Sequence, residues 1–166
     1  MYVNSSEALT ATEPAAVVAE LRDRTEIADA LHRFALGQDL KDRELFASAF
    51  ATEAELDFRP AAAKWGSRPP VMSGRDTIVT TILGMFTGRV DTTHQVTNAR
   101  IAIDGDTARL TALVEAQHLL RADRSVRALL KNPYDVALTR DGDRWLITTM
   151  RIDNAWYTGD PVAIFG

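Results

Sequence analysis

The chain has 166 residues, of which 46% are hydrophobic and 25% charged, and it contains no cysteine. This length and composition indicate one soluble globular domain, and the missing cysteine excludes disulfides, zinc ribbons, iron–sulfur clusters and thiol nucleophiles. A formal net charge of −4 opposes binding to nucleic-acid phosphates. No apolar run approaches the roughly 18 residues that span a bilayer, and the N-terminus lacks a secretory signal. We therefore expect a cytoplasmic protein with no nucleic-acid or membrane partner.

The first part of the chain shows helical spacing. Residues 1–13 are rich in Ser, Thr and Glu and aperiodic, which predicts a flexible tail before a single domain over residues 14–166. From Pro14 to Leu36 the apolar residues recur at helical spacing, so we expect one long helix, or two, ended by Gly37. A second helix is expected in DLKDRELFASAFA, with Asp42 as its N-cap and Asp39 in the bend between the helices.

One strand and one more helix follow. Leu56 and Phe58 alternate with charged residues in EAELDFRP, which predicts a half-buried strand closed by Pro60. A loop through Trp65 comes next. The segment TIVTTILGMFTG then predicts a third amphipathic helix that ends at Gly88.

From Thr92 onward the pattern is that of strands. Two Asp-Gly turns, DGDT (104–107) and DGDR (141–144), predict hairpins between paired strands. Helices first and an antiparallel meander afterwards predict an α+β fold, a cone-shaped and strongly curved mixed or antiparallel sheet with the helices on its concave face, enclosing one pocket. The four β-rich runs are THQVTNARIAI, TARLTALVEAQHLL, PYDVALTR and RWLITTMRIDNAWY.

Two of the three histidines are predicted to point inward. His32 falls inside the first helix, where we expect a surface or structural role. His94 shares a strand face with Val96, and His118 ends a same-face series of apolar residues. A buried neutral imidazole needs a hydrogen-bond partner. The plain alternative for each is a core histidine whose N–H is satisfied.

Asp39 is the candidate partner of His94, although an Asp at a bend also serves often as an N-cap. If the two meet, the carboxylate fixes the imidazole tautomer and stabilises the imidazolium, as in a general-base dyad. Such a dyad suits proton abstraction beside a carbonyl followed by loss of a leaving group. With no cysteine and no Gly-x-Ser-x-Gly elbow, covalent catalysis is disfavoured. His94 and His118 lack metal-ligand spacing and no glycine-rich phosphate loop occurs, so we expect neither metal nor cofactor.

A family resemblance covers roughly residues 20–160. The segments ALGQDLKDRELFASAF, LDF, SGRDTI, TTHQVTN, DGDTARLTALVEAQH and YDVALTRDGDRWLI together resemble the SnoaL-like branch of the nuclear-transport-factor-2-like superfamily. Within it, the chain is similar to scytalone dehydratase and the lindane dehydrochlorinases, which use an Asp–His dyad at positions that are Asp39 and His94 here. Scytalone dehydratase also has a second pocket histidine, which His118 matches with an offset of about one residue.

The chain departs from scytalone dehydratase at two tyrosine positions, which are Gln38 and Phe58 here. The resemblance therefore does not imply a naphthol substrate. The polar pair on the penultimate strand of that enzyme falls near Asn132 and Tyr134, which implies that Tyr134 donates to an enolate oxygen from another wall. The superfamily also includes ketosteroid isomerases, polyketide cyclases, epoxide hydrolases and proteins without catalysis, so the fold alone decides nothing.

A second group of residues is considered for substrate binding. Arg151 shares a strand face with Asp153, and it either binds a substrate carboxylate or forms an outward salt bridge. Several large apolar residues either line the pocket or fill the core: Phe58, Trp65, Phe86, Trp156, Trp145, Met72 and Met85.

We therefore expect a cofactor-independent lyase, by preference a dehydratase, that acts on a hydrophobic carbonyl-bearing small molecule. His94 is the expected base, Asp39 orients it, and His118 and Tyr134 are donors to the leaving group or oxyanion. Three alternatives stay open: a polyketide cyclase, a non-catalytic binding module in which Asp39 and His94 do not meet, and an isomerase resembling ketosteroid isomerase. That isomerase would need a carboxylate base on a strand, with Asp57 or Asp153 facing inward.

A homo-oligomer is also expected, as a dimer or a trimer. A curved sheet of this size usually has an apolar outer face to cover. The run LLRADRSVRALLKNPY (119–134) contains a predicted loop over residues 121–133, and the run is too apolar for a free loop.

Overall fold

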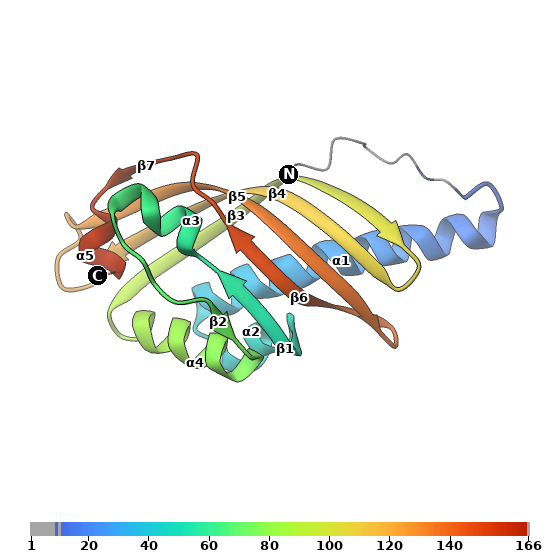
Figure 1. Ribbon diagram of the computed structural model, residues 1–166, viewed down its shortest axis with the longest axis horizontal. Helices are drawn as coiled ribbons and strands as arrows, with labels where there is room; N and C mark the ends of the chain where they lie inside the picture. The colour runs from blue at the N-terminus through green and yellow to red at the C-terminus, as the bar shows by residue number, and fades with distance from the viewer. Residues whose placement is uncertain (1–8, 10, 166) are drawn as a thin grey trace.

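The computed structural model describes residue 9 and residues 11–165, so most of the predicted tail lies outside the described residues. The described part is a curved sheet with helices packed against it (Figure 1). Its helices are α1 (Pro14–Leu40), α2 (Arg43–Ala47), α3 (Arg59–Ala62), the 3₁₀ helix η1 (Ala63–Trp65), α4 (Arg75–Phe86) and α5 (Pro161–Phe165). Its strands are β1 (Phe50–Asp57), β2 (Met72–Ser73), β3 (Val90–Asp104), β4 (Thr107–Leu120), β5 (Arg127–Asp141), β6 (Arg144–Ile152) and β7 (Trp156–Gly159).

The sheet is mixed. Its strand order is β2-β1-β6-β5-β4-β3, and β7 pairs with the first part of β5. Neighbouring strands are antiparallel except β1 and β6, which run parallel. The pairing register shifts between Thr97 and Arg100 on β3, and such bulges bend a sheet. The predicted α+β class with a curved mixed sheet is confirmed.

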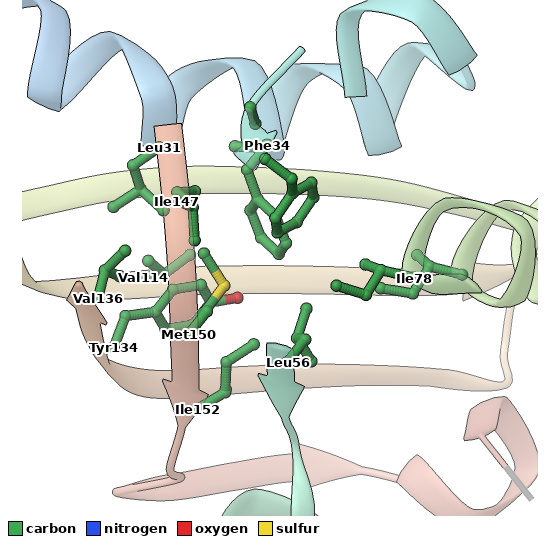
Figure 2. Close-up of a cluster of buried hydrophobic side chains, with 14 of the residues drawn as sticks. Leu31, Phe34, Leu56, Ile78, Val114, Tyr134, Val136, Ile147, Met150 and Ile152 are labelled. Atoms are coloured by element: carbon green, nitrogen blue, oxygen red, sulfur yellow. The ribbon is translucent and has the colours of Figure 1, made fainter. Parts of the chain in front are cut away.

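The core lies between the sheet and α1. This helix runs across the sheet against β3 and β6, and α4 packs beside β1 (Figure 1). Buried residues alternate along β4 and β5, so one face of each strand meets the helices. Figure 2 shows Leu31 and Phe34 of α1 pointing toward sheet residues such as Ile147. The Phe34 ring contacts the Phe46 and Phe50 rings, with centroids 5.5 and 5.8 Å away.

The end of α1 differs from the prediction. The helix continues through Gly37 to Leu40 and ends where Lys41 adopts the left-handed conformation, with φ of 59°. Gly37 serves close packing instead of chain reversal, because a Cβ atom there would lie 2.5 Å from the Cα atom of Phe46. Asp39 therefore lies in the last helical turn and not in a bend.

Other element boundaries are partly as predicted. Asp42 caps α2, since its Oδ1 accepts a bond from the Leu45 N–H at 3.0 Å. The second helix is shorter than expected because Phe50 already begins β1. Both hairpin turns are confirmed, with Gly105 and Gly142 at φ of 56° and 59°.

The segment 121–133 is not a loop over its whole length. Strand β5 begins at Arg127, and Ala128, Leu130 and Asn132 turn their side chains to the buried face. The predicted run over residues 144–157 is interrupted after Ile152, and its last residues form β7. None of the described helices combines the length and the apolar character needed to cross a membrane.

Candidate active site

Asp39 holds His94 through both its ring and its backbone. Asp39 Oδ1 lies 2.7 Å from His94 Nδ1, and Asp39 Oδ2 accepts the His94 backbone N–H at 2.7 Å. The side chains are well buried, with 4% of His94 and 15% of Asp39 exposed. In neutral His94 this arrangement assigns the proton to Nδ1, which leaves the Nε2 lone pair available to the cavity that the ring lines.

A hydroxyl and an ammonium group extend this contact. The Thr92 hydroxyl donates to Asp39 Oδ1 at 2.9 Å. Lys41 Nζ donates to Thr92 Oγ1 at 2.8 Å and to the Gln38 carbonyl at 2.9 Å. Burial lowers the pKa of Lys41, and the negative charges of Asp39 and Asp91 partly oppose that shift. Lys41, Thr92 and Asp39 therefore form a hydrogen-bonded chain that fixes the carboxylate.

His118 lies beside His94 on the concave face of the sheet. The two imidazole rings are perpendicular, with centroids 5.6 Å apart. Burial, and then the neighbouring charge of His94, place the pKa of His118 well below its usual range; the Ala128 backbone works against this shift. No described residue gives His118 Nδ1 a hydrogen bond of normal geometry. Near neutral pH His118 is therefore an uncharged imidazole with one N–H to donate.

Asn132 and Tyr134 bring two more polar groups to the cavity from β5. The Asn132 Oδ1 atom accepts a bond from Asn154 Nδ2 at 2.9 Å, so its amide N–H groups are turned away from Asn154. Burial, and then the charge of Asp39, raise the pKa of Tyr134, and a hydrogen bond with the Asn132 side chain partly offsets this. Tyr134 therefore keeps its hydroxyl proton.

These groups meet in an apolar cavity of about 70 Å³. Its polar lining comes from Gln38, His94, His118, Asn132 and Tyr134. The remaining lining is apolar: Phe34, Leu56, Phe58, Met72, Ile82, Met85, Phe86, Ala116, Leu130, Ile152 and Phe165. Around this cavity, as elsewhere in the described residues, no three His, Asp or Glu side chains gather as metal ligands. The cavity thus contains the His94 imidazole, which is held by a carboxylate, and several neutral hydrogen-bond donors. Its remaining lining consists of apolar side chains.

The model of the SnoaL-like domain family matches residues 19–151, which is most of the chain. This chain belongs to the SnoaL-like family. A relative of this SnoaL-like protein, the terrestric acid biosynthesis cluster protein E of Penicillium crustosum, is 31% identical over 163 residues. The match covers 92% of this chain and 96% of the relative.

Solved structures show the same fold. A candidate scytalone dehydratase from Novosphingobium aromaticivorans has a TM-score of 0.72 at 18% identity, covering 86% of the SnoaL-like chain and 91% of that structure. The hexachlorocyclohexane dehydrochlorinase LinA-type3 from Novosphingobium barchaimii has a TM-score of 0.71 at 18% identity, covering 90% and 97%. The expected SnoaL-like family is thus shown, and these structures share its fold.

The predicted substrate-binding residues of this SnoaL-like protein divide into three groups. Phe58, Phe86 and Asn132 line the cavity with the predicted catalytic residues. Trp65 lines a neighbouring cavity instead. Arg151 and Trp156 line neither of these two cavities, and both side chains are exposed. Strand alternation explains Arg151, since its neighbours Met150 and Ile152 take the buried face.

Some residues around the site of the SnoaL-like protein were not foreseen. Thr92 carried a signal, since it lies two residues before His94 and shares its strand face. Lys41 and Asn154 act through hydrogen bonds that include partners far away in the sequence, Thr92 and Asn132, and no spacing reveals such partners. Phe165 reaches the His118 ring from α5, with centroids 4.9 Å apart. The position of Phe165 depends on how the C-terminal segment folds back onto the sheet, which its sequence does not reveal.

Proposed function

We propose that this protein is a cofactor-independent lyase of the dehydratase type, which acts on a hydrophobic small molecule carrying a carbonyl group. The observation that carries the proposal is the 2.7 Å contact between Asp39 Oδ1 and His94 Nδ1 at the wall of an apolar cavity. In that setting His94 Nε2 is the general base. Asp39 orients the ring and stabilises the imidazolium that forms.

The reaction begins at the carbon beside the substrate carbonyl. His94 Nε2 takes the proton, and the electron pair of the broken C–H bond forms the enolate. The developing oxyanion accepts hydrogen bonds from the Tyr134 hydroxyl and the Asn132 amide, whose orientation Asn154 fixes. Donors held in place before the reaction stabilise such a charge without reorganisation.

Elimination completes the reaction. The enolate electrons form the new C=C bond while the C–O bond to the β-hydroxyl breaks. The proton on His94 returns to the departing hydroxide, so that the products are an unsaturated carbonyl compound and water. His118 is uncharged and adjacent to His94, and its N–H donates a hydrogen bond to the leaving oxygen.

The comparisons support a role in small-molecule chemistry. The relative from Penicillium crustosum is named for a biosynthesis cluster, and one structural neighbour is named as a dehydrochlorinase, an enzyme of elimination. An isomerase with a carboxylate base on a strand is less well supported. Asp57 is paired with Arg59, Asp153 is exposed, and neither lines the cavity.

A panel of aryl β-hydroxy ketones tests the proposal through the absorbance of the enone product. His94→Gln and Asp39→Asn should each lower kcat by roughly 10²- to 10⁴-fold, the usual contribution of a positioned general base. His32→Gln is the matched control, since His32 is exposed on α1. His94→Gln with the wild-type rate contradicts the mechanism. Solvent deuterium that enters the α-carbon without elimination would show that the base forms the enolate but that the protein does not dehydrate these ketones.

We also propose a homo-oligomer. On β4 and β5 the sheet face away from α1 carries half-buried leucines, Leu113, Leu119 and Leu129, and apolar area of this kind favours association. Sedimentation equilibrium distinguishes a dimer or trimer from a monomer, and a concentration-independent monomer contradicts this proposal.

A further inference from the structure

A second cavity lies next to the one that contains His94. Its volume is about 110 Å³. It shares four lining side chains with the first cavity, namely Phe58, Met72, Met85 and Phe165. Its own walls come from α3, η1, the segment before β2 and α4: Ala62, Trp65, Ser67, Pro69, Pro70 and Thr81. None of these lining side chains is ionisable, so the cavity suits a neutral group.

One of the side chains that line this cavity has a buried polar atom without a partner. Trp65 Nε1 is buried, and no described residue accepts a hydrogen bond from it. Its indole ring is fixed by neighbouring aromatic rings: Phe165 stacks on it at 5.8 Å, Phe58 lies at 5.7 Å and Tyr157 at 5.6 Å. A buried donor loses its hydration, and an acceptor that enters the cavity restores the missing bond.

The two cavities are sized for one elongated ligand. An apolar cavity of about 150 Å³ holds a benzene molecule, and neither cavity reaches that volume alone. The shared wall contains Met72 and Met85, whose unbranched side chains rearrange easily. A ligand can therefore extend from His94 past this wall toward Trp65.

We propose that the second cavity is a substrate subsite, which takes a neutral apolar arm and binds an ether or carbonyl oxygen on that arm through Trp65 Nε1–H. This inference rests on the proposed function, because it places the reacting carbonyl beside His94. It specifies the substrate class further as an elongated, uncharged molecule with a carbonyl at one end and a hydrogen-bond acceptor on the other arm.

Two ketones of nearly equal size test the subsite: 4-(4-methoxyphenyl)-2-butanone and 4-(4-ethylphenyl)-2-butanone. Only the first offers an acceptor in place of a methylene group. Both are titrated into the full chain labelled with ¹⁵N, and the indole N–H resonances are followed. Trp145 is an internal control, because its Nε1 already donates to Asp23 Oδ1 at 3.1 Å.

The methoxy ketone should bind between about twofold and tenfold more tightly than the ethyl ketone, as one added hydrogen bond implies. It should also move the Trp65 resonance to lower field. Trp65→Phe should remove the difference in affinity, whereas Trp156→Phe, an exposed control, should keep it. The resonance is read in the wild-type chain, so the test does not depend on the folding of Trp65→Phe.

Equal affinities, absence of binding by either ketone, or a Trp65 resonance that responds alike to both would overturn the subsite. The measurement needs no turnover. A protein that selects the methoxy ketone through Trp65 but dehydrates no β-hydroxy ketone keeps the subsite and loses the proposed function. A protein that dehydrates β-hydroxy ketones but binds both test ketones equally keeps the proposed function and loses the subsite.

Discussion

Asp39 binds His94 at two points, and this restricts the imidazole more than a ring contact alone. The bond from the backbone N–H to Oδ2 fixes the carboxylate against β3, and the ring then meets Oδ1. Rotation of the ring would break the bond at Nδ1. The base is therefore held with Nε2 toward the cavity before any substrate enters, which lowers the reorganisation that the reaction requires.

Thr92 is the residue to change in order to test this positioning. Thr92→Val keeps the shape of the side chain but removes the hydroxyl that Asp39 Oδ1 accepts and that Lys41 contacts. We expect kcat to fall between about twofold and tenfold with little change in KM, because Thr92 acts through Asp39 and does not line the cavity.

Thr93→Val is the matched control, since Thr93 is exposed on the other face of β3. A change confined to KM, or an equal loss of kcat in Thr93→Val, would contradict the positioning role of Thr92.

His118 should make stability depend on pH. Its pKa is lowered by burial and by the neighbouring charges of His94 and Lys41, so the folded chain resists taking this proton. The unfolded chain takes it below a pH of about 6.5. Stability is therefore complete above that pH and falls below it, by up to about 1.4 kcal/mol per pH unit, until the folded pKa is reached.

Urea unfolding at pH values between about 5 and 8 measures this effect. His118→Gln should flatten the acidic part of the curve, because the variant has no imidazole to protonate at that position. His32→Gln, an exposed control, should leave the curve unchanged. Parallel curves for wild type and His118→Gln would show that His118 does not resist protonation.

For single residues, the sequence predicted the property that strand periodicity determines, which is the face of the sheet that a side chain occupies. Alternation with period two placed His94 and His118 on the inner face, and both line the cavity. The same alternation was insufficient for Arg151, whose strand face could not be assigned without knowing the register of β6. The Asn154 bond to Asn132 was beyond reach, because it depends on where the chain turns after β6.

Among the elements, α1 shows why a glycine does not always end a helix. Gly37 is helical, and its missing side chain lets Phe46 of α2 approach the α1 backbone. The residue that ends the helix in the left-handed conformation is Lys41 instead. A sequence pattern that predicts a helix end at glycine cannot separate these two uses, because the close approach comes from a second helix.

Two glycine substitutions should therefore have opposite effects. Gly37→Ala forces a Cβ atom to within 2.5 Å of the Phe46 backbone, and we expect a loss of about 1–3 kcal/mol in the free energy of unfolding. Gly84→Ala meets nothing within 4 Å inside α4, and removing the glycine should add about 0.5–1 kcal/mol. Chemical denaturation measures both, and a Gly37→Ala protein as stable as wild type would contradict the packing account.

Strand β5 was predicted too short because it contains Pro133. A proline within a run argues against a central strand, since it cannot donate a ladder bond. Here the Pro133 carbonyl accepts the Asp153 N–H at 3.0 Å, so the proline faces the gap between β6 and β7. The N–H that proline lacks would point into this irregular stretch of the sheet, where the regular ladder is interrupted. The proline therefore costs β5 no ladder hydrogen bond, and the strand continues past Pro133.

Across the whole molecule, the C-terminal helix contributes part of the cavity wall through Phe165. Arg89, just before β3, donates to the Ile164 and Ala163 carbonyls at 2.7 and 2.9 Å. These bonds hold α5 where Phe165 covers His118. The inner wall of the site thus depends on a contact between two segments distant in sequence.

Arg89→Met should release α5. We expect the amides of residues 162–165 to exchange with deuterium about tenfold faster, because the substitution removes both charged hydrogen bonds to the helix end. Arg43→Met, which removes an exposed bond to Thr80 elsewhere, serves as the control. Unchanged exchange in Arg89→Met would mean that apolar packing of Ile164 alone holds the helix.

The order of helices and strands predicted the α+β class because each element has its own periodicity. The pairing between distant elements was beyond that information. In particular, β1 lies beside β6 in the parallel direction, with Phe50 opposite Ile147. No local pattern records such a partner, because the register arises from the burial of both strands under α1 and α4.

That parallel pair has a consequence for biosynthesis. While the polypeptide leaves the ribosome, β1 has only the two-residue strand β2 to pair with until β6 has been synthesised. The apolar side chains of the N-terminal helices stay exposed over this interval. Long-range strand pairing of this kind is slow, and the partly folded chain is prone to aggregation meanwhile. The nascent protein should accordingly benefit from chaperones that shield it until β6 is available to pair with β1.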